Sequence, residues 1–364
     1  MQTSNIAPPA LRAEFERIAL YMPDRRVYAI DLSDNTNQWG TPPAAFRAMQ
    51  SAGKSALTRY PSGYGEELKE SLAGYLGVRA DQVATGCGSD DVLDAAIRAF
   101  GRPGSRVAVI DPTFPMIPVF ARINGLEPVL VPLTAAYDVD VERMLAVDAS
   151  IIYLCSPNNP TGRSLDRRAI EAIVEHATGI VIIDEAYAEF AHSSAIDLAS
   201  RSERVLVTRT LSKAFGLAGL RIGYGIGDPS LIAAVEKSRG PFKLNALAER
   251  AAVAAVTDDL EWVRETIVAA RVNIARFSTA LGELGLTALS SDANFVLVPV
   301  RDPSRIANGL RVRDIAVKAF DNLAQVSPAL AATHGAALRV TMAPWDVLDS
   351  TLTALRDVLR EVRA

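Results

Sequence analysis

Short apolar stretches rich in valine and isoleucine recur between residues 83 and 224, and they predict β-strands. Several are apolar at every position, which is typical of strands covered on both faces rather than on one. The predicted strands are 83–85, 106–110, 128–131, 151–154, 180–183, 205–208 and 221–224. Helical patterns lie between many of them, for example at 90–100 and 165–177. This alternation predicts an α/β fold with a mostly parallel central sheet.

The last third of the chain has a different pattern. A long helical stretch at 260–284 precedes two predicted strands at 293–298 and 337–341, and residues 310–318 fit either a helix or a strand. Apolar positions with a period of 3.6 predict a closing helix at 345–362. We therefore expect an N-terminal arm (1–40) that joins the small domain, a large domain (41–250), and an interdomain helix with a smaller α+β domain (251–364).

Composition and charge narrow the class of protein. The 364 residues are 49% hydrophobic and 22% charged, as in globular proteins, and the net charge of −4 gives no indication of nucleic-acid binding. Residues 1–26 lack the features of a signal peptide, and no stretch approaches the ~18 apolar residues of a membrane span. Cys87 and Cys155 form no metal motif, and the three histidines do not cluster. A cytoplasmic protein without a metal site is expected.

Two glycine-containing loops follow predicted strands, and open parallel sheets bind ligands at that edge. Residues 85–90 join a strand to a helix, where glycines and free N–H groups suit a phosphate; alternatively, Ser89 or Asp90 is only a helix N-cap. Residues 156–162 (Ser-Pro-Asn-Asn-Pro-Thr-Gly) form a rigid loop or an ordinary turn.

A carboxylate ends another of these apolar strands. Asp184 follows the apolar residues 180–183, and a buried carboxylate costs several kcal/mol unless a cation pairs with it. A protonated ring nitrogen would serve, and Tyr187 could donate to a ring oxygen. The alternatives for Asp184 are a pair with a neighbouring arginine or an N-cap.

Lys213 is the lysine whose surroundings suit covalent chemistry. It follows an apolar strand, and Thr210, Ser212 and Arg221 accompany it. Burial lowers the pKa of a lysine, so that its neutral amine can attack an aldehyde, while hydroxyls and a guanidinium suit a phosphate. The other lysines considered are expected to be solvated surface charges: Lys54, Lys69, Lys237 and Lys243.

These features together require a ligand with a phosphate, a basic ring nitrogen and an aldehyde, and pyridoxal 5'-phosphate has all three. The chain resembles the fold-type I, class I/II aminotransferases and is most similar to the histidinol-phosphate aminotransferase family. The motifs that carry the resemblance lie, in order, at 59–61, 88–91, 111–114, 157–162, 184–187, 210–213, 219–221 and 338–341. The resemblance implies a large domain with a mostly parallel sheet and a smaller α+β domain.

The resemblance also implies roles around the cofactor. Lys213 would carry the Schiff base, and Asp184 would keep the ring nitrogen protonated. Asn159 and Tyr187 would bond the phenolic oxygen, and Phe114 would stack on the ring. The phosphate would be bound by the backbone near Ser89 and Asp90, by the side chains of Thr210, Ser212 and Arg221, and by Tyr60 of a second subunit. A homodimer with shared active sites is therefore expected.

Substrate-side residues depart from the family pattern. Arg339 would bind the substrate carboxylate, unless it is a surface arginine on an edge strand. Asn35 and Trp39 lie in a segment that normally faces the substrate, where Trp39 replaces a tyrosine. Phe114 replaces the usual stacking tyrosine, and Lys318 stands where the family has a phosphate-binding arginine. The donor is histidinol phosphate or an aromatic or other amino acid.

The implied reaction is a ping-pong transamination in which a 2-oxo acid such as 2-oxoglutarate is the acceptor. A decarboxylase or lyase on the same cofactor, similar to the threonine-phosphate decarboxylases, is the main alternative. A nicotinamide oxidoreductase is disfavoured, because the glycines at 223–227 lack the rest of a dinucleotide fingerprint.

Overall fold

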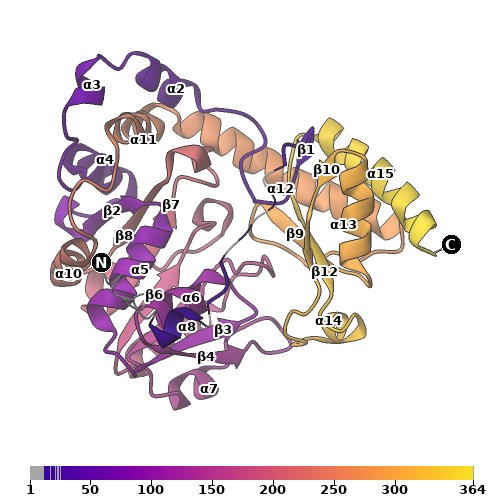
Figure 1. Cartoon of the computed structure of the whole chain (residues 1–364), viewed down its shortest axis with the longest axis horizontal. Helices are drawn as coiled ribbons and strands as arrows, with labels where there is room; N and C mark the ends of the chain where they lie inside the picture. The colour runs from indigo at the N-terminus through magenta and orange to yellow at the C-terminus, as the bar shows by residue number, and fades with distance from the viewer. Residues whose placement is uncertain (1–11, 17, 21, 23, 25, 364) are drawn as a thin grey trace, which may run out of the picture.

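A seven-stranded sheet organises most of the computed structural model, which describes residues 12–16, 18–20, 22, 24 and 26–363 (Figure 1). Its order is β2–β8–β7–β6–β5–β3–β4. The strands are β2 (Val83–Cys87), β3 (Arg106–Asp111), β4 (Glu127–Pro132), β5 (Ile151–Cys155), β6 (Ile180–Asp184), β7 (Val205–Thr210) and β8 (Ile222–Ile226). Only β8 among them runs antiparallel to its neighbours. The predicted strands and the mostly parallel sheet are therefore confirmed.

Helices cover this sheet because their apolar stripes face it. The apolar side of α5 buries Val92, Leu93, Ala96 and Ile97, and every residue of the central strands β5, β6 and β7 is buried. The helices in this part are α2 (Pro43–Gln50), α3 (Ser55–Thr58), α4 (Glu66–Leu76), α5 (Ser89–Phe100), α6 (Met116–Ile123), α7 (Val141–Ala146), α8 (Arg167–His176), α9 (Ile196–Arg201), α10 (Pro229–Arg239) and α11 (Ala246–Asp258).

A second, three-stranded antiparallel sheet of order β11–β12–β9 lies in the C-terminal part. Figure 1 shows the long helix α12 (Leu260–Glu283) running from the side of the large sheet toward this smaller one. The other elements are β9 (Phe295–Pro299), α13 (Pro303–Val312), β10 (Ile315–Ala316), β11 (Lys318–Phe320), α14 (Pro328–Ala332), β12 (Ala337–Thr341) and α15 (Trp345–Arg363). Residues 310–318, which fit either a helix or a strand, contain the end of α13 and then β10.

The N-terminal segment joins the smaller sheet region through β1 (Ile30–Asp31), which pairs in parallel with β10. The amide of Thr341 on β12 also donates to the carbonyl of Leu32. A short helix, α1 (Ala13–Glu16), precedes this segment, and the first eleven residues of the predicted arm lie outside the described residues. The expected domain limits stay a prediction.

One expectation about surface charge is wrong. Lys69 of α4 is not a solvated lysine, because its Nζ lies 2.8 Å from a carboxylate oxygen of Glu236 on α10 and both side chains are mostly covered. The ion pair holds two neighbouring helices together. Among the described residues, no helix is long and apolar enough to cross a membrane.

The glycines of β8 are explained by packing, not by dinucleotide binding. A Cβ on Gly223 would lie 2.0 Å from the backbone nitrogen of Ser89 and 2.2 Å from the carbonyl carbon of Gly88. The start of α5 therefore rests directly on the backbone of β8, which requires glycine there.

We expect Gly223→Ala to destabilise the cofactor-free protein by about 1–3 kcal/mol, because the backbone of residues 88–89 must move. Gly74→Ala is the matched control: it lies in α4 with open space around the added methyl group and should stabilise by ~0.5–1 kcal/mol. Thermal and urea unfolding measure both changes. A Gly223→Ala variant as stable as the parent would contradict the packing argument.

Candidate functional site

A group of hydrogen-bond donors, which we call the cup, lies where β2, β7 and β8 meet at one edge of the sheet. It consists of the first-turn amides of α5 and the side chains of Thr210, Ser212 and Arg221. Gly88 precedes α5 with φ of +81°, and a Cβ there would lie 2.5 Å from Nη2 of Arg221. No side chain caps α5, so the alternative reading of Ser89 or Asp90 as an N-cap is wrong. The first-turn amides of α5, at Ser89 and Asp90, are therefore available for an anion.

The rest of the cup comes from the segment between β7 and β8. The hydroxyl of Thr210 donates to that of Ser212 at 2.9 Å, and Nη1 of Arg221 lies 3.5 Å from the Ser212 oxygen. Arg221 also contacts the carboxylate of Asp90 at 3.3 Å. Hydroxyl, guanidinium and helix amides are the groups that bind phosphates in proteins.

Lys213 lies beside this cup and reaches across to the N-terminal segment. Its Nζ donates to the carbonyl of Asp34 at 2.9 Å and lies 5.9 Å from the centre of the Tyr187 ring. Burial, reinforced by the positive charge of Arg339, lowers the pKa of Lys213 to about 8. A substantial fraction of the amine is therefore neutral near physiological pH, as attack on an aldehyde requires.

Asp184 ends β6 at the same edge and is 4% exposed. Its Oδ2 accepts a hydrogen bond from Tyr153 at 2.8 Å, and its Oδ1 accepts one from the amide of Ala186 at 3.1 Å. Burial raises the pKa of Asp184 to about 6, although both donors act against the rise. Both of these partners are neutral, so the alternative of a structural pair with an arginine receives no support.

Tyr187 and Asn159 each have a hydrogen-bond partner from a distant part of the chain. The Tyr187 hydroxyl accepts a hydrogen bond from Nδ2 of Asn35 at 3.0 Å, and burial raises its pKa to about 12. The Oδ1 of Asn159 accepts from Nη1 of Arg339 at 2.6 Å. Arg339 is 7% exposed and lies on β12, the middle strand of its sheet. The alternative of a surface arginine on an edge strand is therefore wrong.

Lys318 lies directly opposite Arg339 in the β11–β12 pair. Directly opposite residues in an antiparallel pair point to the same face, so two cationic side chains leave this sheet side by side. The arginines nearby in sequence have other partners: Arg311 donates to Asn308, and Arg313 pairs with Glu361.

Phe114 and Trp39 are partly buried against the apolar core. Phe114 lies in the loop after β3, and the completely buried Asn158 fastens that loop by donating to the carbonyl of Pro112 at 2.9 Å and accepting from Thr113 at 2.7 Å. The adjacent asparagines thus differ: Asn158 holds the loops together, while Asn159 points to Arg339.

Tyr60 is 85% exposed, and its ring packs on Phe242 at 5.1 Å. This exposed aromatic pair is a surface available to a second copy of the chain.

Three residues to which the sequence motifs assign no role also contribute to the site. Tyr153 bonds Asp184, Asn158 fixes the loop of Phe114, and Thr341 accepts from the amide of Asn35 at 3.1 Å. The only sequence signal for Tyr153 is a phenol within an otherwise aliphatic strand.

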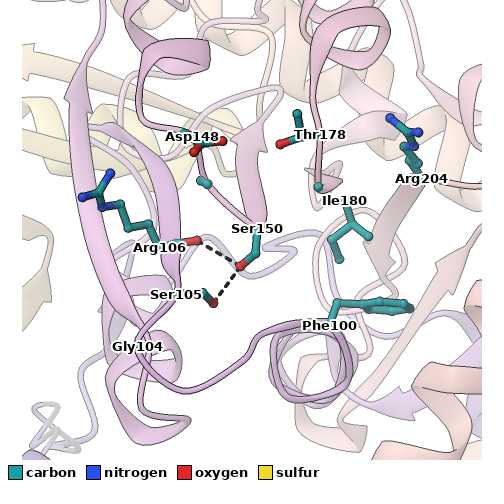
Figure 2. A pocket seen from close by; sticks show the side chains of 11 residues that line it. Phe100, Gly104, Ser105, Arg106, Asp148, Ser150, Thr178, Ile180 and Arg204 are labelled. Carbon is teal, nitrogen blue, oxygen red and sulfur yellow. Dashed lines mark hydrogen bonds between the residues drawn. The ribbon is translucent and has the colours of Figure 1, made fainter.

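A separate cavity of about 640 Å³ lies at the opposite edge of the sheet, at the amino ends of β3, β5 and β6 (Figure 2). Its two arginines bond carbonyls at the ends of helices: Arg106 donates to the Val147 carbonyl after α7, and Arg204 to the Ala177 carbonyl after α8. These bonds satisfy helix C-termini, so we assign the arginines a structural role.

Comparisons with known proteins agree with this geometry. The family model for class I and II aminotransferases matches residues 28–348. The histidinol-phosphate aminotransferase of Desulfitobacterium hafniense is 35% identical over 317 residues, which cover 84% of this chain and 87% of that protein. The one from Geotalea uraniireducens is 33% identical over 360 residues, with 96% and 99% coverage.

The fold also matches a solved structure. The histidinol-phosphate aminotransferase from Sinorhizobium meliloti, in complex with pyridoxal 5'-phosphate, superposes with a TM-score of 0.87 at 26% identity, covering 98% of this chain and 99% of that one. Aspartate aminotransferase from Thermus thermophilus, at 23% identity and a TM-score of 0.74, shares the fold.

The buried carboxylate predicts a pH-dependent effect of Asp184→Asn on the cofactor-free protein. Unfolding returns the Asp184 pKa from about 6 to the ordinary 3.8, so the wild-type protein loses stability relative to the variant as pH rises from about 4 to 6, and the loss levels off above 6. The difference corresponds to about 3 kcal/mol at pH 8 and disappears toward pH 4. Unfolding of both proteins across this pH range measures it. A difference independent of pH would exclude burial of the charge as its cause.

Proposed function

Because the chain belongs to the class I and II aminotransferase family and uses pyridoxal 5'-phosphate, we propose that it transfers an amino group from histidinol phosphate to a 2-oxo acid by a ping-pong mechanism. The observation that carries the proposal is the convergence of a pKa-lowered lysine and a buried carboxylate at one edge of the large sheet, where Arg339 of the small sheet reaches Asn159.

The residues present fit the cofactor. The close approach of Arg221 to Gly88, which leaves no room for a Cβ, makes a cup for a phosphate next to Ser89, Thr210 and Ser212. The buried carboxylate of Asp184 would hold a protonated ring nitrogen. Asn159 and Tyr187 would bond the phenolic oxygen, and Phe114 would cover the ring. When bound, the cofactor supplies an aldehyde that joins amines and a ring that takes up electrons.

Lys213 would hold the cofactor covalently as a Schiff base and would then transfer a proton through its Nζ. The neutral Nζ would accept a proton from the substrate Cα and would later donate it, acting first as a base and then as an acid. In the cofactor-free protein, the hydrogen bond to the Asp34 carbonyl fixes the position of Nζ before the cofactor binds. Asp34 belongs to the same segment as Asn35 and Trp39, which we expect to contact the substrate.

The substrate's anionic group would lie between Arg339 and Lys318. Like charges directly opposite each other on a strand pair are unfavourable, and an anion between them removes the repulsion. The phosphate of histidinol phosphate would fill this place in the first half-reaction, and a carboxylate of an acceptor such as 2-oxoglutarate in the second. Lysine lacks the planar fork of arginine, so it would recognise the anion as a point charge.

A second copy of the chain would complete the site. The exposed pair of Tyr60 and Phe242 supports a homodimer in which Tyr60 contacts the cofactor phosphate of the partner. Both cysteines are free thiols, which is consistent with the reducing cytoplasm, where we expect the enzyme to act.

We expect Lys213→Ala to lose the borohydride-reducible link to the cofactor and the transamination activity. The exposed Lys237 supplies the control, because Lys237→Ala should retain both. Absorbance after borohydride reduction and transfer of the amino group to 2-oxoglutarate are measured. Full transamination by the Lys213→Ala variant would refute the mechanism, and release of carbon dioxide from an amino-acid donor in place of a 2-oxo acid would indicate a decarboxylase.

We expect Lys318→Ala to lower the half-reaction efficiency with histidinol phosphate by about 10–100-fold, the range of a charge-assisted contact. The same change should have little effect with histidinol, which lacks the phosphate, and Arg311→Ala should have little effect with either. Loss of cofactor absorbance on mixing with each donor measures the rates. Faster reaction of the parent enzyme with phenylalanine or tyrosine than with histidinol phosphate would overturn the donor assignment.

A further inference from the structure

Tyr153 is a polar side chain in the interior of the large sheet, and it is 1% exposed. It lies on β5 opposite Ile182 of β6, two residues before Asp184. Because strand side chains alternate between faces, Asp184 lies on the same face as Ile182 and diagonal to Tyr153, within reach of a phenol. The hydroxyl of Tyr153 donates to Oδ2 of Asp184 at 2.8 Å.

The two hydrogen bonds to Asp184 leave part of the carboxylate open. Tyr153 reaches Oδ2 and the amide of Ala186 reaches Oδ1, and a carboxylate has roughly four lone-pair sites. A rigid strand and a fixed backbone amide thus hold both oxygens, while the carboxylate keeps acceptor capacity for a ligand. Both donors are neutral groups that favour the charged carboxylate without occupying the place of a cation.

We propose that Tyr153 is a positioning residue for the cofactor: its hydroxyl orients Asp184 and keeps it as a carboxylate, so that the ring nitrogen is bound in its protonated form. This inference rests on the role proposed above for Asp184. It gives a function to a buried phenol that neither the sequence motifs nor the proposed reaction uses.

The other groups around Asp184 act on it in known directions. Asp90 of α5 raises the Asp184 pKa by like-charge repulsion, whereas the Thr208 hydroxyl of β7 lowers it. Cys155 stays a neutral thiol, because burial raises its pKa far above the ordinary value. Burial likewise keeps the phenol of Tyr187 neutral at physiological pH.

The test uses Tyr153→Phe, which keeps the ring and removes the hydroxyl. The probe is pyridoxine 5'-phosphate, which has the ring nitrogen and the phosphate but an alcohol in place of the aldehyde, so that Lys213 cannot react with it. Loss of one hydrogen bond to a charged group should raise the dissociation constant of cofactor-free protein about tenfold at pH 7.5. The pH below which affinity falls should rise by about one unit.

Two controls separate positioning from general packing. In an Asp184→Asn background, Tyr153→Phe should change the affinity less than twofold, because there is no carboxylate to hold. Tyr224→Phe removes another fully buried phenol from the same sheet and should leave the affinity and its pH dependence unchanged. Melting temperatures of the cofactor-free variants show that each is folded.

The outcomes distinguish the proposed role of Tyr153 from the proposed role of Asp184. Unchanged affinity in Tyr153→Phe, or an equal loss in the Asp184→Asn background, would overturn the role of Tyr153. Unchanged affinity in Asp184→Asn itself would overturn the role of Asp184 in the proposed function. Should Tyr153→Phe not fold, infrared difference spectra between wild type and Asp184→Asn test the same point in the folded parent. A carboxylate band at pH 7.5 supports the proposal, and a protonated carboxyl band refutes it.

Discussion

The buried carboxylate of Asp184 is the constraint on which the site depends. The carboxylate lies at the end of a strand whose residues are all buried, and the hydrogen bonds that reach it come from a phenol and an amide. Neutral donors offset only part of the cost of removing a charge from water. The carboxylate of Asp184 therefore destabilises the cofactor-free fold, and binding of a protonated ring nitrogen would reduce this cost. The stability that is lost at this position would be regained as binding affinity for the cofactor, as is common where a functional site departs from the best packing.

Three hydrogen bonds of the site join segments that lie far apart in the sequence. Arg339 bonds Asn159, Lys213 bonds the Asp34 carbonyl, and Asn37 donates to the carbonyl of Ala214 at 2.9 Å. The segment from residue 33 to 37 thus connects the lysine loop of the large sheet to β12 of the small one. A substrate anion that binds Arg339 would replace the hydrogen bond to Asn159, which joins the small sheet to the large one. This arrangement keeps buried polar groups satisfied without a ligand.

The sequence predicts those parts of the structure that depend on residues close to one another in the chain. The strands follow from uninterrupted apolar stretches, and the loop and lysine motifs predict which edge of the sheet would bind the cofactor. The role of Tyr153 was not predictable, because it depends on the register between β5 and β6, which the strand pattern leaves open. The contact of Asp34 with Lys213 joins residues 179 positions apart, and Lys69 differs from a surface lysine only through α10. Such contacts arise from tertiary packing, which a local pattern does not encode.

The pair of Lys318 and Arg339 shows why substrate-binding residues are harder to predict from the sequence than cofactor-binding residues. Two cations opposite each other destabilise the small sheet, yet Arg339 is also held by Asn159 and lies 5.4 Å from the ring of Phe295. Its direction is thus set by the fold, whereas Lys318 on the partly exposed edge strand has a flexible stem. A fixed fork beside a movable point charge can accommodate anions of different shape, such as a phosphate and a carboxylate. A ping-pong enzyme needs this tolerance, because donor and acceptor occupy the same site in turn.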